Sequence, residues 1–370
     1  MRVALVHDWL TGMRGGEKVL EGLCELYPNA ELFTLLHLRG SVSPLIERRP
    51  IHTSFVQRLP MAAAKYRWYL PLFPAAVEQF DLDGFDLVIS SSHCAAKAVI
   101  PRGTARHISY CHSPMRYGWD QFDAYFGPAR VGAIASRWLF RPVLARLARW
   151  DAATANRVDR FIANSNYVAG RIRRYYNRQS TTVYPPADTA FFQPDATAPG
   201  SHFLIVSALV PYKRIEIAMD ACARIGARLR IVGDGPGRDD LVRRAGNQVE
   251  FVGRATNEQI RDEYRRAAAV LLPGEEDFGI VPVEAQACGR PVVALGRGGV
   301  LETVIDGETG VLVPEPTVEA FAAGLERAAR ATFDPARLRA NAERFSRGRH
   351  VARMKAVIEE TVAAPAGYRW

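Results

Sequence analysis

The segment from Leu271 to Ala294 constrains the fold of this 370-residue chain more than any other. It reads LLPGEEDFGIVPVEAQACGRPVVA: an apolar strand end, an acidic loop with a glycine, a short helix beginning near Pro282, and a second apolar strand. A strand, a loop and a helix in this order form the half of a parallel α/β unit that binds anions, because the first turn of a helix leaves amide N–H groups unpaired. The sequence therefore predicts an anion site at the amides of Gly279, Ile280 and Val281.

Two glutamates in this segment, Glu276 and Glu284, have seven residues between them. Gly279 and Pro282 interrupt any continuous helix between the two positions. One carboxylate is therefore expected in the loop and the other in the helix. We expect the two groups to serve different purposes.

The chain opens in a similar way, with a strand, a glycine-rich turn and a helix. Val3 to Val6 form the expected strand, Gly15 and Gly16 lie in the turn, and the helix runs from Glu17 to about Leu26. Adjacent glycines let a ligand approach the backbone closely, although a tight turn without a ligand is the alternative. The length of the chain also favours two domains of ordinary size.

A stretch of linker composition separates the two expected domains. Residues 188–201 end in DATAPGS and are rich in alanine, proline, glycine and small polar side chains. We expect an N-terminal domain over residues 1–190 and a second domain over residues 191–345. A final segment, residues 346–370, contains a helix from about Arg347 to Ala363.

Histidines follow two expected strands of the first domain. The strand that begins at Phe85 runs through three serines into His93, and the strand from His107 to Cys111 runs into His112. The carboxyl ends of parallel strands hold ligand-binding groups, so His93 and His112 are candidate site residues. For each of them, a purely structural hydrogen-bonding role stays open.

Two further candidates follow His112 in the same loop. Arg116 could bind a phosphate or a sugar hydroxyl through a charge-assisted hydrogen bond, and Trp119 could stack on a sugar ring.

In the second domain, the expected strand Phe203 to Val206 leads to Lys213 and Arg214 ahead of a helix from Ile215. A lysine at such a turn is well placed to neutralise a diphosphate. The glycines that begin at Gly233 fail the dinucleotide fingerprint, because Arg238 stands where the third glycine belongs. A nicotinamide dehydrogenase is therefore not favoured.

The cysteines indicate a reducing compartment. They are five in number, scattered, and without a C-x-x-C pair, which argues against a disulfide framework or a cysteine zinc site. No signal-peptide pattern opens the chain, and no apolar run reaches the roughly 20 residues that span a bilayer. We expect a soluble protein of the cytoplasm.

The net charge of +9 is concentrated between residues 102 and 178, where fourteen arginines face four aspartates. Such a cluster suits an anionic bilayer, a pyrophosphate-linked acceptor or nucleic acid, or it is a plain solvated surface. Within it, residues 131–157 predict one amphipathic helix with an apolar stripe. This helix could lie on a membrane, but the lack of apolar bulk after Asp151 favours a core position. The stripe is formed by Trp138, Leu139, Val143, Leu144, Leu147 and Trp150.

These motifs resemble those of the retaining glycosyltransferases of family 4. The family string E-x-F-G…E-A-x-A-x-G-x-P-V is matched here by Glu276, Phe278, Gly279, Glu284, Ala285, Ala287, Gly289, Pro291 and Val292. The string H-S-P-M-R-Y-G-W-D, which begins at His112, is similar to that of a subgroup of bacterial mannosyltransferases in surface-polysaccharide assembly. The resemblance covers nearly the whole chain. It implies a GT-B α/β fold, with two Rossmann-like parallel-sheet domains facing an inter-domain cleft and a C-terminal helix that crosses back to the first domain.

The resemblance also implies roles for single residues. In the family, the first glutamate contacts hydroxyls of the donor sugar and the second holds the ribose. The implied catalytic residues are His112, Lys213 and Glu276. The implied donor-binding residues are Gly15, Gly16, Lys213, Arg214, Gly233, Gly253, Arg254, Glu276, Phe278, Gly279, Ile280, Val281 and Glu284. The acceptor-side residues are His93, Arg116 and Trp119.

The implied activity is retaining transfer of a hexose to a saccharide or lipid-linked acceptor in cell-surface polysaccharide synthesis. The resemblance favours mannose from GDP-mannose, with no metal, no cofactor and no nucleic-acid partner. Peripheral contact with the anionic inner face of the cytoplasmic membrane is part of this expectation. The alternatives are a UDP-sugar donor, an epimerase on the same fold, or a non-catalytic sugar-nucleotide-binding module. The last is suggested by Ala208, which stands where the family has an arginine.

Overall fold

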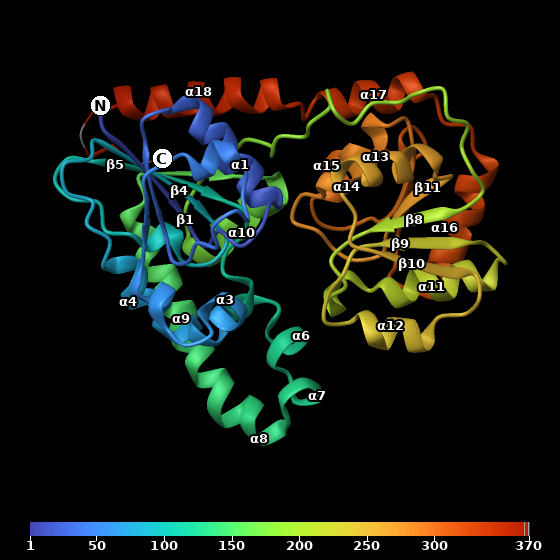
Figure 1. Cartoon of the computed structure of the whole chain (residues 1–370), viewed down its shortest axis with the longest axis horizontal. Coiled ribbons are helices and arrows are strands. Elements are labelled where there is room, and N and C mark those ends of the chain that lie inside the picture. Colours follow the sequence, from blue (N-terminus) through green and yellow to red (C-terminus); the bar gives the residue numbers. More distant parts are fainter. Residues whose placement is uncertain (366, 369) are drawn as a thin grey trace. The chain divides into compact units, whose positions relative to one another are not determined.

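The computed structural model describes residues 1–365, 367, 368 and 370, without the side chains at positions 124, 125, 129 and 130 (Figure 1). The side chain of Arg130, one of the arginines of the basic stretch, thus lies outside the described residues. The chain divides into two compact units, each described by itself. The first unit contains Met1–Pro186 and His350–Trp370, and the second contains Ala187–Arg349.

The first unit is built on a seven-stranded parallel sheet in the order β3-β2-β1-β4-β5-β6-β7. The strands are β1 (Val3–His7), β2 (Glu31–Thr34), β3 (Ile51–Thr53), β4 (Leu87–Ser92), β5 (Arg106–Cys111), β6 (Arg160–Ala163) and β7 (Thr181–Thr182). All five residues of β1 are buried, which is expected of a central strand with both faces covered.

Alternate residues of β1 enter two different hydrophobic cores. Leu5 packs with α1 (Gly15–Leu26) and α18 (Arg347–Ala363), which lie side by side over one face of the sheet (Figure 1). Val6 packs on the other face with α4 (Phe73–Glu78) and α9 (Arg141–Thr154). A smaller core forms around α10 (Asn166–Tyr176).

The second unit has a six-stranded parallel sheet in the order β10-β9-β8-β11-β12-β13. The strands are β8 (Phe203–Val206), β9 (Leu229–Val232), β10 (Val249–Gly253), β11 (Ala269–Leu272), β12 (Val292–Leu295) and β13 (Gly310–Val313). The core of this unit contains apolar residues of α11 (Ile215–Arg224) and α16 (Val318–Arg330). The α/β prediction with two Rossmann-like parallel sheets is confirmed.

The remaining elements are shorter or lie around these layers. The α-helices are α2 (Pro44–Glu47), α3 (Ala62–Lys65), α5 (Arg116–Trp119), α6 (Phe122–Phe126), α7 (Pro128–Val131), α8 (Ala133–Ala135), α12 (Arg238–Arg244), α13 (Asn257–Arg266), α14 (Ile280–Ala287), α15 (Val300–Thr303) and α17 (Pro335–Glu343). The 3₁₀ helices are η1 (Phe55–Arg58), η2 (Tyr66–Leu72), η3 (Ala96–Ala98), η5 (Ala155–Arg157) and η6 (Pro211–Lys213), and η4 (Ser136–Phe140) is a π-helix.

The single helix expected over residues 131–157 begins at Ala133 and is irregular. Its backbone stays helical through α8, the π-helical η4, α9 and the 3₁₀ turn η5, but the hydrogen-bond pattern changes between them. Pro142 lies at the start of α9 and has no N–H to continue the α-helical bond pattern, which accounts for the change. The apolar stripe divides at the same point, because Leu144 and Leu147 are buried whereas Trp138 and Leu139 are exposed.

Two helices begin two residues earlier than expected. α14 starts at Ile280 rather than near Pro282, because proline is tolerated in the first turn, where its missing N–H has no intrahelical partner. α1 starts at Gly15 rather than at Glu17. Gly15 and Gly16 thus form the first turn of α1 and do not precede it.

A buried histidine makes the first unit sensitive to acid. In β5, His107 Nε2 lies 2.9 Å from Ser90 Oγ and Nδ1 lies 3.0 Å from the backbone oxygen of Arg157. Burial lowers the pKa of His107 to about 4, although the bond to Arg157 acts in the opposite direction.

We expect the stability of the first unit to fall as the pH drops from 7 to 5. The unfolded chain takes up the proton near pH 6.5 and the folded chain only near pH 4, so the contribution of His107 is complete above pH 6.5 and is lost below it. The loss at pH 5 is about 2 kcal/mol. Thermal unfolding at the two pH values should show a shallower pH dependence for His107→Gln than for the wild type. Identical pH dependence in the variant and the wild type would contradict the assignment.

Candidate active site

The second unit brings Lys213 and Glu276 together at the carboxyl ends of adjacent strands. η6, which follows β8, contains Lys213, and the loop after β11 contains Glu276. The Lys213 ammonium donates a hydrogen bond to Glu276 Oε1, and the two side chains are only 17% and 18% exposed. Ligands bind at this edge of open parallel sheets, so the contact lies where a ligand is expected.

The backbone around this pair is fixed by close contact between loops. The N–H of Gly299 donates to the carbonyl oxygen of Glu276 at 2.8 Å, and Glu276 forms an isolated parallel bridge with Gly298. A Cβ added at Gly298 would lie 2.3 Å from the carbonyl oxygen of Glu276. Similarly, a Cβ added at Gly274 would lie 2.7 Å from the Cα of Lys213. Both members of the pair are therefore held by backbone packing.

The helix that follows, α14, presents the other predicted donor residues. Gly279 precedes the helix in the left-handed region at φ +86°, ahead of Ile280 and Val281 in the first turn. Glu284 is buried, and its Oε2 accepts a hydrogen bond of 3.1 Å from Tyr264 Oη. Burial, and then the neighbouring carboxylate, raises the pKa of Tyr264 well above its usual value. The phenol therefore stays a hydrogen-bond donor to Glu284.

Phe278 lies inside the second unit. Its ring is 3% exposed and packs against Phe345 at 5.5 Å. The side chain supports the loop, which leaves the backbone of Phe278 as the part that could meet a ligand.

Gly233, Gly253 and Arg254 lie together at the carboxyl ends of β9 and β10. The N–H of Gly233 donates to the carbonyl oxygen of Gly253 at 2.8 Å. Arg254 Nε donates to Asp234 Oδ2 at 3.0 Å. Sequence reasoning missed Asp234 as a partner of Arg254, although its place directly after Gly233 was a visible signal.

Ala208 is exposed just after β8, and Arg214 follows η6 in the left-handed region at φ 50°. Such a conformation is uncommon for arginine and is found at functional turns. Arg214 directly follows Lys213 in the sequence, whereas alanine stands at position 208 in place of the family's arginine.

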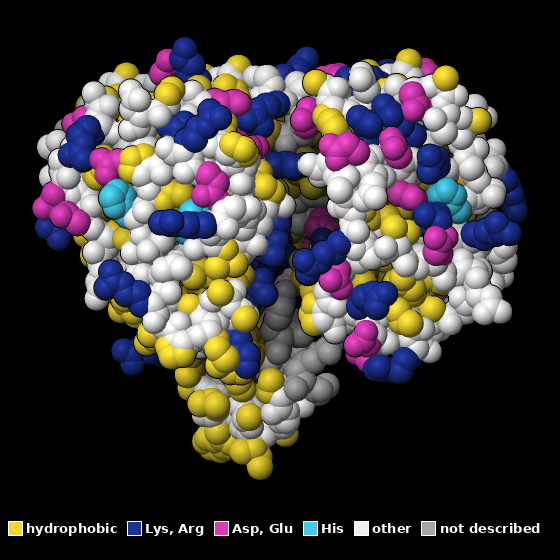
Figure 2. Space-filling view, viewed as in Figure 1, with side chains coloured by type: hydrophobic (Ala, Val, Ile, Leu, Met, Phe, Trp, Pro, Cys, Tyr) yellow, Lys and Arg dark blue, Asp and Glu magenta, His cyan; other side chains and the backbone are white. Residues whose placement is uncertain are grey.

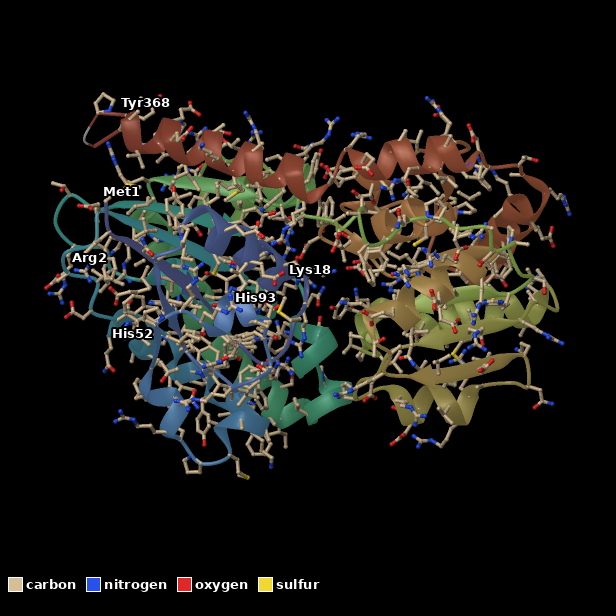
Figure 3. The ribbon with its side chains drawn as sticks, turned by 45° about the horizontal axis from the view of Figure 1, so that its top comes forward. Met1, Arg2, Lys18, His52, His93 and Tyr368 are labelled. Carbon is tan, nitrogen blue, oxygen red and sulfur yellow. The ribbon has the colours of Figure 1, made fainter. Side chains whose placement is uncertain are left out.

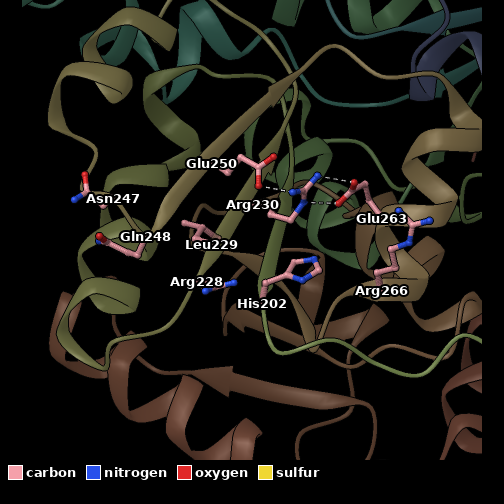
Figure 4. Close-up of a pocket in the computed structure, with 9 residues that line it drawn as sticks. All are labelled: His202, Arg228, Leu229, Arg230, Asn247, Gln248, Glu250, Glu263 and Arg266. Carbon is pink, nitrogen blue, oxygen red and sulfur yellow. Dashed lines mark hydrogen bonds and ion pairs between the residues drawn. The ribbon is translucent and has the colours of Figure 1, made fainter.

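A separate cavity of about 470 Å³ lies at the opposite edge of this sheet, at the amino ends of β8, β9 and β10 (Figure 4). In it, Arg230 donates one hydrogen bond to Glu250 and two hydrogen bonds of 2.9 Å to the oxygens of Glu263. It contains none of the predicted site residues.

In the first unit, His112 and Gly16 lie against each other. His112 Nε2 is 2.8 Å from Ser91 Oγ, and a Cβ added at Gly16 would lie 3.6 Å from His112 Nε2. Burial, followed by the charges of His93 and His7, lowers the pKa of His112 well below its usual value. His112 is therefore neutral at pH 7.

His93, labelled in Figure 3, follows β4 and joins the same cluster. Its ring centroid is 6.4 Å from that of His112, and its Nδ1 is 3.0 Å from Asp8 Oδ2. The edge of its ring meets Trp9 at 4.4 Å between centroids. The structure thus brings together the two histidines that the sequence singled out.

Sequence reasoning missed Asp8, the carboxylate that organises this cluster. Its two oxygens accept the backbone N–H groups of four consecutive residues after β4 at 2.6, 3.0, 2.6 and 2.8 Å. Burial alone would raise the pKa of Asp8, but the charge and hydrogen bonds of His93 outweigh it and hold the pKa far below its usual value. The position of Asp8, directly after β1, was the signal available in the sequence.

A second unpredicted group is His7, whose ring nitrogens have no hydrogen-bond partner among the described residues. The ring is nearly inaccessible, and its Nε2 is 3.7 Å from Glu17. Buried unsatisfied polar groups are rare and concentrate at functional sites.

Arg116 and Trp119 lie together on α5. Trp119 Nε1 donates to Asp151 Oδ2 at 2.8 Å, and its ring stacks on Tyr175 at 4.6 Å. One face of Trp119 is thus covered by the protein, which leaves only its other face for the predicted sugar contact.

Two family models match the chain in succession. Residues 14–191 match the family described as Glycosyltransferase Family 4, and residues 188–345 match the family described as Glycosyl transferases group 1. Together the two matches extend from residue 14 to residue 345 and support a glycosyltransferase of the family 4 type.

Curated relatives match part of the chain. A D-inositol 3-phosphate glycosyltransferase of Mycobacteroides abscessus is 32% identical over 282 residues, which is 65% of this chain and 63% of the relative. The protein with the same name from Rhodococcus erythropolis is 34% identical over 219 residues, 51% of this chain and 50% of the relative. The chain thus spans less than two thirds of the length of these relatives.

Solved structures share the fold over nearly the whole chain. Anabaena Alr3699/HepE in complex with UDP has a TM-score of 0.69 and 18% identity, with 97% of this chain and 100% of that chain covered. Sucrose-phosphate synthase from Thermosynechococcus elongatus has a TM-score of 0.72 and 20% identity, with 99% and 100% covered. The expected GT-B class of fold is confirmed.

We expect Gly298→Ala to destabilise the second unit by about 2 kcal/mol or more, because the new Cβ would overlap the carbonyl oxygen of Glu276 in a backbone region that disfavours side chains. Gly348→Ala is the matched control. It lies in α18 with nothing within 4 Å of the added Cβ, and alanine favours the helix. Thermal unfolding should show a lower melting temperature for Gly298→Ala alone. Equal melting temperatures would contradict the close packing at Glu276.

Proposed function

We propose that this chain is a retaining glycosyltransferase that moves a hexose from a nucleotide sugar to a saccharide or lipid-linked acceptor. The observation that carries the proposal is the contact between Lys213 and Glu276 at the carboxyl ends of β8 and β11. In glycosyl transfer, a diphosphate leaves with extra negative charge and the sugar must be held by its hydroxyls. A cation and a carboxylate side by side meet these two needs.

The proposed reaction exchanges one bond at the anomeric carbon. The bond to the donor phosphate oxygen breaks, the bond to the acceptor oxygen forms on the same face, and the acceptor proton passes to the departing phosphate. Lys213 and the amides of Gly279, Ile280 and Val281 stabilise the charge on the diphosphate. Glu276 orients the sugar hydroxyls and forms no covalent intermediate. His112 is assigned to the sugar side of the reaction.

We assign further residues of each unit to the donor or to the acceptor. Glu284 is assigned to the ribose hydroxyls, and Gly233, Gly253 and Arg254 to the base. His93, Arg116 and Trp119 are assigned to the acceptor. These roles are proposals that the contacts described above support.

The transfer is proposed to need no metal and no cofactor. This proposal rests on Lys213 and the α14 amides, which supply positive potential for a diphosphate. Over the described residues, there is no group of three or more histidine, cysteine or acidic side chains placed to hold a metal ion.

The proposed donor is GDP-mannose, because the string that begins at His112 resembles that of a mannosyltransferase subgroup. A UDP-sugar is the second candidate, since a structure of the similar Alr3699/HepE contains UDP and glucose. The two curated relatives described above are named for a phosphorylated acceptor, and the arginines between residues 102 and 178 would suit such a group.

The proposed setting is cell-surface polysaccharide synthesis in the cytoplasm, with peripheral contact on the inner face of the membrane. In the part of the chain that the structure describes, no helix is both long and apolar enough to cross a bilayer. A non-catalytic sugar-nucleotide-binding role is the remaining alternative, motivated by Ala208.

A thermal-shift panel of GDP, UDP, ADP and their sugars tests the proposal. A nucleotide at 100 times its dissociation constant should add about 2.7 kcal/mol of stability. We expect GDP and GDP-mannose to give the largest shifts. Lys213→Ala should reduce the shift, because a hydrogen bond to a charged group is worth about 1.5–3 kcal/mol.

Lys355→Ala is the control, since Lys355 is an exposed lysine on α18. It should leave all shifts unchanged. Larger shifts with UDP and UDP-sugars would support the transferase proposal but replace GDP-mannose by a UDP-sugar as the donor. No shift with any nucleotide would indicate that the donor site has been lost through Ala208.

A further inference from the structure

The α8 and η4 segment of the first unit exposes three large apolar side chains within six residues. Ile134, Trp138 and Leu139 are 80%, 72% and 58% exposed. Figure 2, in the same view as Figure 1, shows hydrophobic side chains gathered over this end of the unit. Monomeric proteins rarely expose such clusters without a binding partner. We call Ile134, Trp138 and Leu139 the apolar tip.

The other side of the same stretch holds the apolar tip in place. Ser136 is buried, and further along the chain Leu144 and Leu147 pack into the core that also contains Val6 and Phe73. The exposed side chains are therefore carried by an element anchored in the first unit, and cannot turn inward without breaking that core.

The charge around the apolar tip is mainly positive. Asp123 is a nearby carboxylate, and its Oδ1 lies 3.9 Å from Arg141 Nη2 with both side chains exposed. From residue 124 to residue 150 the sequence has five arginines and no aspartate or glutamate. Arg137, Arg141, Arg146 and Arg149 are all exposed, and the Arg137 guanidinium lies 5.3 Å from the centre of the Trp138 ring. An apolar face with an arginine rim and an exposed tryptophan is typical of segments that lie in a membrane interface.

We propose that α8 and η4 insert into the surface of an anionic phospholipid bilayer. Ile134, Trp138 and Leu139 enter the boundary between headgroups and acyl chains, and the arginine rim, namely Arg137, Arg141 and Arg146, meets the lipid phosphates. This inference rests on the proposed function in one respect: a lipid-linked acceptor would lie in such a membrane. It assigns the membrane contact to one element of the chain.

The charge favours a bilayer over other occupants. A second copy of the chain, docked tip to tip, would bring two arginine rims together, and like charges oppose this. Nucleic acid would use the arginines but leave Ile134, Trp138 and Leu139 in water. An anionic bilayer satisfies both the apolar tip and the arginine rim.

Vesicle co-sedimentation tests the proposal without any donor or acceptor, so its result is independent of the transferase assignment. The vesicles contain phosphatidylcholine with or without phosphatidylglycerol, at about 0.1 M and about 1 M salt. Wild-type protein should bind the anionic vesicles, with weaker binding at high salt. The triple change Ile134→Ser, Trp138→Ser and Leu139→Ser should lower the partition coefficient at least about tenfold.

Matched controls separate this element from general surface effects. Leu301→Ser removes a leucine that is 55% exposed in the second unit and should not change vesicle binding. Arg137→Glu with Arg141→Glu should abolish the preference for anionic vesicles. Arg330→Glu, at a side chain 80% exposed on α16, should leave the preference intact.

Three outcomes would overturn the proposal. They are absence of wild-type binding, equal binding by the triple variant with an unchanged melting curve, and a concentration-dependent dimer in sedimentation velocity that the triple variant abolishes. Quenching of the tryptophan emission by brominated lipids that is lost in Trp138→Phe would support insertion at this residue.

Discussion

The ion pair between Lys213 and Glu276 is the interaction on which the proposed donor site depends. Each side chain is more than four-fifths covered, and a charge in such a position is costly unless an opposite charge lies beside it. The parallel order of β8 and β11 brings the two residues together across 63 positions of sequence. A bound nucleotide sugar could replace each member of this ion pair. Its phosphates would accept hydrogen bonds from the Lys213 ammonium, and its hydroxyls would donate hydrogen bonds to the Glu276 carboxylate. The contact thus holds both side chains in place where the proposed donor would bind.

In the first unit, a buried carboxylate likewise holds neighbouring groups in place. Asp8 accepts four successive backbone N–H groups and holds the Nδ1 of His93. An anion with so many donors is fixed in position, and it fixes the loop after β4 in turn. His112 lies beside this group as a neutral imidazole. Both units therefore place polar side chains at the carboxyl ends of buried strands, where the apolar sheet supplies rigidity.

Local sequence signals predicted much of this arrangement. The bounds of β8 and α18 and the start of α11 at Ile215 agree with the expected ones, because apolar runs and turn residues mark them clearly. Glu276, Glu284 and Lys213 were singled out as candidates because a strand end that runs through a loop into a helix is visible in a sequence. The apolar pattern of residues 131–157 predicted a helix but not its π-helical turn before Pro142, and it did not show that Trp138 faces water.

Long-range contacts account for what the sequence could not supply. Nothing in the local pattern shows that the four amides after β4 converge on Asp8, or that Tyr175 covers one face of Trp119. The same holds for Phe278, whose burial against Phe345 depends on a residue 67 positions away. A polar residue at the end of an expected strand can be recognised in the sequence as a candidate site residue. Its partners become evident only once the sheet has assembled.

Calorimetry of Glu276→Gln with a nucleoside diphosphate and with the matching nucleotide sugar tests the proposed roles of Glu276 and Lys213. The variant should bind the diphosphate at least as tightly as the wild type does, because Lys213 no longer shares its charge with Glu276. The variant should also lose the additional affinity that the sugar provides in the wild type. An equal loss for both ligands, or an unchanged contribution of the sugar, would contradict the assignment of Glu276 to the sugar and of Lys213 to the diphosphate.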